Sequence, residues 1–299
     1  MRPRIIVIGS SNTDMIIRVP HIPGPGETIL GGEFMIVQGG KGANQAIAAA
    51  RADGEVIFIA CLGDDTFGKK AIIELAKEGV DTSHIKIVKD IPSGVAMINV
   101  AETGENSISV APGANSYLLP DDIINAEDII ASADIVLMQL EIPIESVKMA
   151  INLANKHKVP IILNPAPART MSSDLLKKID FITPNENEAA LLVNINSNSV
   201  DFKTLARTLK NSGPGSVIIT LGEKGAFFIH NDLEKQIPGY KVNAVDTTAA
   251  GDTFNGYLAV SLAKGIDIER AVQIANKAAS LCVTRLGAQP SIPFINEVI

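Results

Sequence analysis

The 299-residue chain has no tryptophan, two cysteines and few aromatic residues, which make up 4% of it. Cys61 and Cys282 lie far apart and without CxxC spacing, so the sequence indicates neither a disulfide framework nor a zinc knuckle. Basic residues are fewer than acidic ones, and the formal net charge is -7. Because phosphate backbones are held mainly by Lys and Arg, this charge argues against nucleic-acid and membrane partners, and any anionic ligand must be bound by local features.

Long apolar runs are missing too. No stretch approaches the roughly 18 apolar residues of a membrane span, and residues 5–9 form too short a run for the core of a signal peptide. We therefore expect a cytoplasmic protein. The chain also lacks GxxxxGK(S/T), GxGxxG after a strand and HExxH, and its four histidines are dispersed, so P-loop, Rossmann and zincin interpretations lose their support.

What is present is a globular composition, 46% hydrophobic and 20% charged, with short apolar runs that alternate with helical patterns. Amphipathic stripes at 67–79 and 144–154 predict helices. The alternation predicts an α/β fold with a mostly parallel central sheet flanked by helices in three layers, and ligands at the carboxyl ends of the strands. The expected buried strands are 4–9, 55–60, 135–140, 160–163, 181–183 and 217–221.

Two regions, 13–37 and 94–110, break this rhythm. In the second, Ile108 and Val110 alternate with Ser107 and Ser109 after a Thr-Gly-Glu turn, a pattern typical of half-buried antiparallel strands. We interpret both regions as a small sheet that projects from a single domain spanning 1–299, and as a candidate lid or dimer surface. No repeat or flexible linker marks a domain boundary.

The small-residue segment 246–256 leads into an apolar helical pattern at 257–263. A helix start presents unpaired N–H groups and about half a positive charge, so it binds phosphate without a lysine. Asp252 beside such a site is placed to accept a hydroxyl proton while the backbone holds the transferring phosphoryl group. The alternative is that Asp252 only stabilises the start of the helix.

Four other segments carry candidate binding groups. The glycine-rich loop 39–44 allows close approach of a ligand, and its Lys41 and Asn44 could donate to sugar hydroxyls, but such a loop is often only a turn. Asn12 with Asp14 could read a diol. Segment 220–225 could pass beside a nucleotide or merely join two strands, and Glu188, after Asn185, could reach hydrated magnesium or serve as a helix cap.

Taken together, these segments resemble the PfkB family of carbohydrate kinases, and most closely its ribokinase branch, over nearly the whole chain. Residues 249–252 read Ala-Ala-Gly-Asp where the wider family usually has Gly-Ala-Gly-Asp, a variant common in ribokinases that favours ribose over fructose or a nucleoside. The scarcity of aromatic residues gives no sign of a stacking pocket for adenosine. The matching segments follow family order at 12–14, 39–44, 164–168, 184–186, 220–225, 246–256 and 284–291.

The resemblance implies transfer of the terminal phosphate of ATP to O5 of D-ribose, with Asp252 as the base and Ala249, Ala250, Gly251 and Asp252 as an anion hole. It implies a homodimer through the projecting sheets, magnesium brought by ATP, and a monovalent cation, expected to be potassium, at Asp246, Thr248, Cys282, Arg285, Gly287 and Ser291. Glu188 matches the magnesium-associated position. The implied sugar site is Asn12, Thr13, Asp14, Gly40, Lys41, Gly42, Ala43, Asn44, Glu141 and Asp252, and the implied ATP site is Asn185, Thr220, Leu221, Gly222, Glu223, Lys224, Gly225, Gly251, Asp252 and Asn276.

Two alternatives stay open at this point. The acceptor could be fructose or another furanose-like sugar with the same chemistry. The chain could also be a sugar- or nucleotide-binding regulator without catalysis, although such a protein has no chemical need for the carboxylate of Asp252 next to Gly251.

Overall fold

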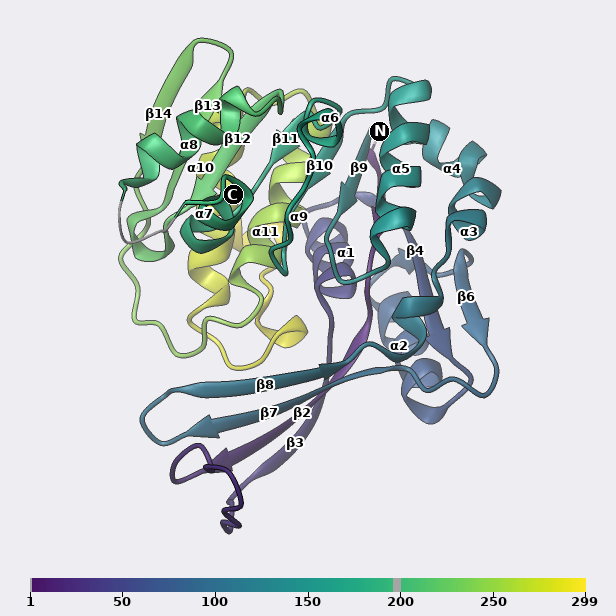
Figure 1. Cartoon of the computed structure of the whole chain (residues 1–299), viewed down its shortest axis with the longest axis vertical. Coiled ribbons are helices and arrows are strands. Elements are labelled where there is room, and N and C mark those ends of the chain that lie inside the picture. The colour runs from purple at the N-terminus through teal and green to yellow at the C-terminus, as the bar shows by residue number, and fades with distance from the viewer. Residues whose placement is uncertain (1, 196–199) are drawn as a thin grey trace.

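The computed structural model describes residues 2–195 and 200–299 and contains one large and one small β-sheet (Figure 1). The strands are β1 Arg4–Ile8, β2 Asn12–Val19, β3 Phe34–Gly39, β4 Glu55–Gly63, β5 Val80–Asp81, β6 Ile85–Val88, β7 Gly94–Ala101, β8 Asn106–Ala111, β9 Ile135–Met138, β10 Ile161–Leu163, β11 Phe181–Ile182, β12 Ser216–Thr220, β13 Ala226–His230 and β14 Leu233–Ile237. The helices are α1 Lys41–Arg51, α2 Thr66–Lys77, α3 Pro120–Asn125, α4 Glu127–Ala131, α5 Ile144–Lys156, α6 Ser173–Leu176, α7 Glu186–Leu192, α8 Phe202–Asn211, α9 Ala250–Ala263, α10 Ile268–Cys282 and α11 Ile295–Val298.

The large sheet runs in the order β14-β13-β12-β11-β10-β9-β1-β4-β5, with β6 paired to β4. Its strands from β12 to β5 pair in parallel, whereas β12, β13 and β14 form an antiparallel meander at one edge. All six strands expected from the apolar runs are present within one to three residues of their expected bounds. The α/β prediction with a mostly parallel central sheet is confirmed.

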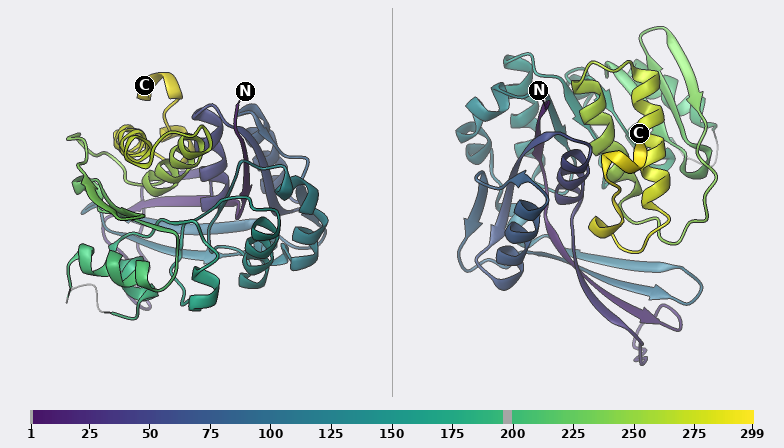
Figure 2. Two further views of the ribbon diagram at one scale, coloured as in Figure 1. Left: turned by 90° about the horizontal axis from the view of Figure 1, so that it is seen from above. Right: turned by 180° about the vertical axis from the view of Figure 1, so that it is seen from behind.

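Alternate residues of the central strands pack into opposite layers of the fold. On β1, Ile6 and Ile8 belong to a core shared with α5 and α8, while Ile5 and Val7 belong to a core shared with α1, α9 and α10. Figure 2 shows these helix layers on the two sides of the sheet. The nearly continuous apolar sequence of the strands follows from this burial on both faces.

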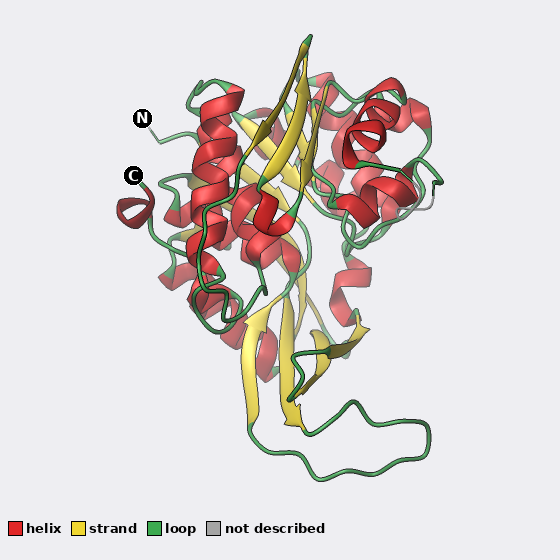
Figure 3. Ribbon diagram, turned by 90° about the vertical axis from the view of Figure 1, so that its left-hand side faces the viewer, coloured by secondary structure: helices red, strands yellow, loops and turns green. Residues whose placement is uncertain are grey.

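The small sheet has the order β3-β2-β7-β8 and projects from the body at the end where β1 runs on into β2 (Figures 1 and 3). The central pair β2 and β7 is parallel, and both outer pairs are antiparallel. We call this element the projecting sheet. The prediction of a second, small sheet is confirmed, but the expectation of antiparallel strands holds for the outer pairs and is wrong for β2 and β7.

Two features of the helices bear on the predictions. Gly79, the last residue of the predicted helical segment 67–79, has a φ of 81° just after α2, a conformation that glycine adopts without strain at the end of a helix. Helix α9 begins at Ala250, seven residues before the apolar pattern that predicted it, so the small-residue segment itself forms its first two turns. Among the described residues, no helix has the length and apolar character needed to cross a membrane.

Candidate active site

A cleft of about 920 Å³ lies between the carboxyl ends of the central strands and the projecting sheet. Residues of β2, α1 and the start of α9 line it, together with residues that directly follow β10 and β11, as expected for a parallel sheet. The predicted residues that it brings together are Asn12, Asp14, Gly40, Lys41, Asn44, Glu141, Asn185, Glu188, Thr220, Asp246, Thr248, Ala249, Ala250, Gly251, Asp252 and Gly287.

Asp252 lies in the first turn of α9, buried against α1. Asn44 Nδ2 donates to its Oδ2 at 2.9 Å, and Gln45 Nε2 donates to its Oδ1 at 2.9 Å. The two helices approach so closely because Gly256 of α9 faces Ala48 of α1 without a side chain. The Asp252 carboxylate is therefore fixed by the facing helix rather than by the N-terminus of its own helix.

Burial is the main influence on this carboxyl group and raises the pKa of Asp252. The Lys41 ammonium and the amides of Asn44 and Gln45 lower it, and Glu141 adds to the increase. For Lys41, burial lowers the pKa, but Asp252, Glu141, Glu188 and Asp14 outweigh it and raise the value overall. A partly desolvated carboxylate with a raised pKa has the properties of a general base.

The backbone before α9 is shaped to receive an anion. Ala249, the residue that caps the helix, has φ 60° and ψ 9°, a left-handed conformation that non-glycine residues rarely adopt. The N–H groups of the first turn have no intrahelical acceptor. Gly251 would place an added Cβ with nothing within 4 Å, so its main chain is open to the cleft. The sequence-based expectation of an anion site at 249–252 fits this geometry.

The sugar candidates gather where β2 leaves the body of the molecule. Asn115 Nδ2 donates to Asn12 Oδ1 at 2.8 Å. The NH₂ group of Asn12 is left for a ligand in the cleft, which Asn12 lines. Glu141 accepts from the Lys41 backbone N–H at 3.1 Å. Gly40 has φ 88°, and an added Cβ would come 2.6 Å from the Asn12 nitrogen, so only glycine fits there. Thr13, Gly42 and Ala43 are buried behind this group and do not line the cleft.

The sugar-binding role expected for Asp14 predicts that sugar affinity depends on pH. Burial, followed by the charges of Glu141 and Asp252, raises the pKa of Asp14 to about 6. Protonation removes its ability to accept two hydroxyl hydrogen bonds, so we expect sugar affinity to fall about tenfold per pH unit below pH 6. Calorimetric titration from pH 4.5 to 8 measures this, and Asp14→Asn should bind weakly with a flatter profile. Constant wild-type affinity across pH 5–7 would contradict the role.

The nucleotide candidates are only partly brought together. Asn185 and Thr220 line the cleft and are joined by a parallel bridge, with the Thr220 N–H bonded to Pro184 O at 3.0 Å. Segment 220–225 does form the turn between β12 and β13, with Gly222 and Gly225 both at positive φ. Outside the cleft lining lie Leu221, Gly222, Glu223, Lys224, Gly225 and Asn276.

The sequence left open whether Glu188 caps a helix or reaches hydrated magnesium, and its position allows both. Its carboxylate accepts from the Asn185 N–H at 2.9 Å, and Asn185 Oδ1 accepts from the Glu188 N–H at 2.8 Å, a reciprocal cap of α7. It also lines the cleft, where burial is the first cause of a raised pKa. The capping role is therefore observed, and a second role toward magnesium stays a prediction.

The six residues of the expected cation site lie in two neighbouring stretches of chain, the loop before α9 and the segment from the end of α10 to residue 291. Asp246 Oδ1 accepts from the Thr248 N–H at 2.9 Å, and Oδ2 accepts from the Gly287 N–H at 2.9 Å. The Cys282 thiol lies 3.6 Å from Thr248 O and 2.9 Å from the hydroxyl of Ser291. The side chain of Arg285 pairs with Glu297 instead. Carboxylate, hydroxyl and carbonyl oxygens thus gather here, a donor set suited to a hard cation.

Several buried polar residues of the site were not predicted. Gln139 follows β9, Thr183 follows β11, and each has at most 1% of its surface exposed. A polar residue at the end of an apolar strand, or within an apolar helix, is the signal that could have revealed them. The unpredicted group is Ser10, Gln45, Asn115, Gln139, Asn164, Thr183 and Asn255.

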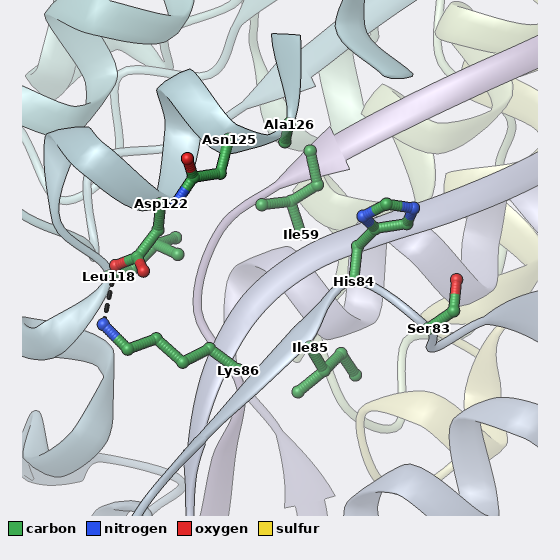
Figure 4. A pocket seen from close by; sticks show the side chains of 9 residues that line it. All are labelled: Ile59, Ser83, His84, Ile85, Lys86, Leu118, Asp122, Asn125 and Ala126. Carbon is green, nitrogen blue, oxygen red and sulfur yellow. Dashed lines mark hydrogen bonds and ion pairs between the residues drawn. The ribbon is translucent and has the colours of Figure 1, made fainter. Parts of the chain in front are cut away.

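A smaller cavity of about 220 Å³ lies elsewhere, between β6 and α3 (Figure 4). Its two opposite charges, Lys86 and Asp122, pair with each other at 2.8 Å. None of the predicted site residues lines it. The larger cleft is therefore the candidate active site.

Comparison with known proteins agrees with this geometry. The model of the pfkB family carbohydrate kinases matches residues 2–295. The chain belongs to that family. It is 44% identical to a ribokinase of Haemophilus influenzae over 300 residues, covering all of this chain and 98% of the relative, and 39% identical to a deoxyribokinase of Salmonella typhi, covering 98% and 96%.

A solved PfkB-family structure extends the likeness to the fold. The Arabidopsis thaliana ribokinase complexed with ribose and ATP superposes with a TM-score of 0.91 at 32% identity, covering all of this chain and 98% of that one. The sequence-based assignment to this family and to carbohydrate kinases is confirmed.

Proposed function

We propose that this PfkB-family kinase transfers the γ-phosphoryl group of ATP to O5 of D-ribose, giving D-ribose 5-phosphate and ADP. The observation that carries the proposal is the joint position of Asp252 and the open first turn of α9 at one end of the cleft, with the polar group Asn12, Asp14, Lys41 and Glu141 in the same cleft. Ribokinase relatives at 40–44% identity support ribose as the acceptor.

In this mechanism, Asn12, Asp14, Lys41, Asn44 and Glu141 hold the sugar hydroxyls. Asn44 Oδ1 is buried and has no partner within the described chain, as expected for an atom that accepts from the substrate. Asp252 takes the O5 proton as the new O–P bond forms and the bond to the β-phosphate oxygen breaks, with ADP leaving. The 249–252 backbone stabilises charge on the phosphoryl oxygens, with Thr13, Gly42 and Ala43 supporting the loops.

The charge of the cleft supports a role for magnesium. Its lining carries the carboxylates of Asp14, Glu102, Glu141, Glu188, Asp246 and Asp252 but only Arg18 and Lys41 as cations. A triphosphate would be repelled unless a divalent cation came with it. Among the described residues, no three His, Cys, Asp or Glu side chains could hold a metal together. We infer that magnesium arrives with ATP and that Glu188 reaches it through water.

A monovalent cation, proposed to be potassium, would be held by oxygens around Asp246, Thr248, Cys282, Arg285, Gly287 and Ser291, several of them backbone carbonyls. These loops adjoin the left-handed Ala249, so the cation would set the anion-site backbone rather than touch reacting atoms. The adenine part of ATP would lie toward Asn185, Thr220 and Asn276, beside the 221–225 turn. A cytoplasmic location fits the need for ATP.

The experiment that tests the function is ADP release with magnesium ATP against ribose, deoxyribose, fructose, adenosine and no sugar. Each acceptor is measured with potassium and with a large organic cation in its place. We expect turnover that depends on ribose and rises with potassium. Turnover with another acceptor would keep the fold and mechanism but reject ribose, while binding without turnover for every sugar would favour the regulator hypothesis. Equal rates with either cation would reject the cation site.

We further propose that the projecting sheet acts as a lid over the sugar and joins two copies of the chain. Closure would exclude water, which otherwise takes the phosphoryl group from ATP. The sheet exposes apolar side chains on both faces, among them Met97 at 53% and Ile108 at 54%. Exposed apolar sheet surface of this kind is a liability unless it is covered.

Sedimentation tests the dimer. We expect about twice the chain mass of 31.6 kDa for the wild type, and monomers for the double variant Met97→Asp/Ile108→Asp, which places a charge on each face of the projecting sheet. Ile73→Asp, on the exposed side of α2, is the matched control and should remain dimeric. A wild-type monomer at working concentration would refute the assembly.

A further inference from the structure

Behind Asp252 lies a chain of buried side-chain amides. Gln139 Nε2 donates to Gln45 Oε1 at 2.6 Å. Gln45 Nε2 in turn donates to Asp252 Oδ1 at 2.9 Å and to Asn164 Oδ1 at 3.1 Å. Gln45 and Gln139 are fully buried, and neither lines the cleft, so they act on the reaction only through other residues.

The orientation of the Gln45 amide is determined at both ends. The Asp252 carboxylate and the Asn164 oxygen can only accept, so the Gln45 NH₂ points toward them and its oxygen accepts from Gln139, whose own Oε1 has no partner within the described residues. Asn164 uses its own NH₂ on Thr183 O at 3.0 Å, which leaves its oxygen to accept from the same Gln45 NH₂. A carboxylate can only accept hydrogen bonds, and an amide turned by 180° would set two oxygens against each other.

We propose that Gln45, oriented by Gln139, is a positioning residue that keeps Asp252 ionised and its carboxylate aimed at the sugar hydroxyl. This inference rests on the proposed role of Asp252 as the base. Hydrogen bonds to a carboxylate favour its charged form, and here they oppose burial. The charged groups around Asp252 are Lys41, which also favours ionisation, and Asp14, Glu141 and Glu188, which oppose it.

The contacts with Asp252 also show that two neighbouring residues of α1 have different roles. Asn44 and Gln45 are neighbours in sequence and donate to different oxygens of Asp252. Asn44 lines the cleft and keeps an oxygen for substrate, whereas Gln45 is directed inward and is satisfied by protein groups alone. Gln45 therefore sets the state of the base whether or not sugar is bound.

The test is the pH profile of kcat at saturating ribose in Gln45→Met and Gln139→Met, where the loss of sugar affinity expected from protonation of Asp14 does not contribute. Gln45→Met removes the donor, so the acid limb should move upward by about one pH unit or more, with activity near the plateau largely recovered at high pH. Gln139→Met only frees the amide to turn and should give a smaller shift in the same direction. Gln273→Met, the same change on α10 away from the cleft, should leave the profile unchanged.

A merely structural role would lower the melting temperature of these variants without moving the acid limb. An unmoved limb in folded Gln45→Met and Gln139→Met would overturn the proposal. Should either variant not fold, wild-type protein labelled with ¹⁵N-glutamine decides. The side-chain NH₂ signals of the buried glutamines should move with pH at the midpoint of the acid limb, and not in Asp252→Asn. Glutamine side-chain signals that do not change with pH would also overturn the proposal.

These outcomes separate this inference from the proposed function. A wild type that shows no sugar-dependent turnover refutes the kinase proposal, while the NMR titration still tests the hydrogen bond from Gln45 to Asp252. A wild type that turns over, loses activity in Asp252→Asn and keeps its acid limb in both glutamine variants refutes only the positioning role.

Discussion

Replacing Asp252 by asparagine is expected to lower kcat by about 10² to 10⁴, the usual range for losing a general base. Asparagine keeps the size of the side chain but cannot take the hydroxyl proton. Its oxygen can still accept from Gln45, and the Asn44 amide, whose Oδ1 has no partner within the described residues, can turn to accept from the new NH₂, so the packing of α9 on α1 should persist. Steady-state turnover with ribose measures the loss, and calorimetry should show ATP binding close to that of the wild type.

The same variant should be at least as stable as the wild type near neutral pH. Because burial raises the folded-state pKa of Asp252 above its ordinary 3.8, the folded chain holds the proton more tightly than the unfolded chain. Ionised Asp252 therefore costs stability as the pH rises above 3.8, and asparagine removes that cost. Thermal melting at pH 7 checks it, with exposed Asp121→Asn as control. Near-normal turnover, or a clear loss of stability, would instead make Asp252 a residue that stabilises the helix.

Most of the fold could be predicted from the sequence, because strands that are buried on both faces are continuously apolar. Strands such as 4–9 and 217–221 were recognisable for that reason, and the alternation at 107–110 revealed the projecting sheet. The apolar stripe marked α9 only from residue 257, because its first turns, 250–256, are made of small residues that face the cleft and α1. The sequence nevertheless placed Asp252 near the start of the helix, two residues from its observed first residue.

The residues of the candidate site fall into those that a local sequence motif reveals and those that only long-range contacts define. Residues in short motifs, such as Asp14, Lys41 and Asp252, were predicted because each motif is local. Gln139 was not, because what defines its role is a hydrogen bond to Gln45, 94 positions away in sequence. Asn115 was missed likewise, since it holds Asn12 across 103 positions. The spacing of residues along a chain carries no information about such contacts. They become visible only in the structure, where each buried amide must find hydrogen-bond partners.

The contact between α9 and α1 gives the second large effect. In Gly256→Ala, the new Cβ would come 2.5 Å from Ala48 Cβ and 2.7 Å from the Ala49 nitrogen, so the helices must separate. Overpacking of this kind costs about 1–3 kcal/mol. Because Asp252 is held by Asn44 across the same contact, turnover should fall together with stability. Urea unfolding and ribose-dependent turnover measure the two losses.

Gly251→Ala is the counterpart on the same helix. An added Cβ meets nothing within 4 Å, and alanine is a better helix former than glycine, so stability should be unchanged or rise by up to about 1 kcal/mol. Gly251 lines the cleft where the phosphoryl group must touch main chain, so turnover should fall sharply. If Gly256→Ala kept full stability, or Gly251→Ala kept full turnover, the division between a packing glycine and a ligand-facing glycine would be wrong.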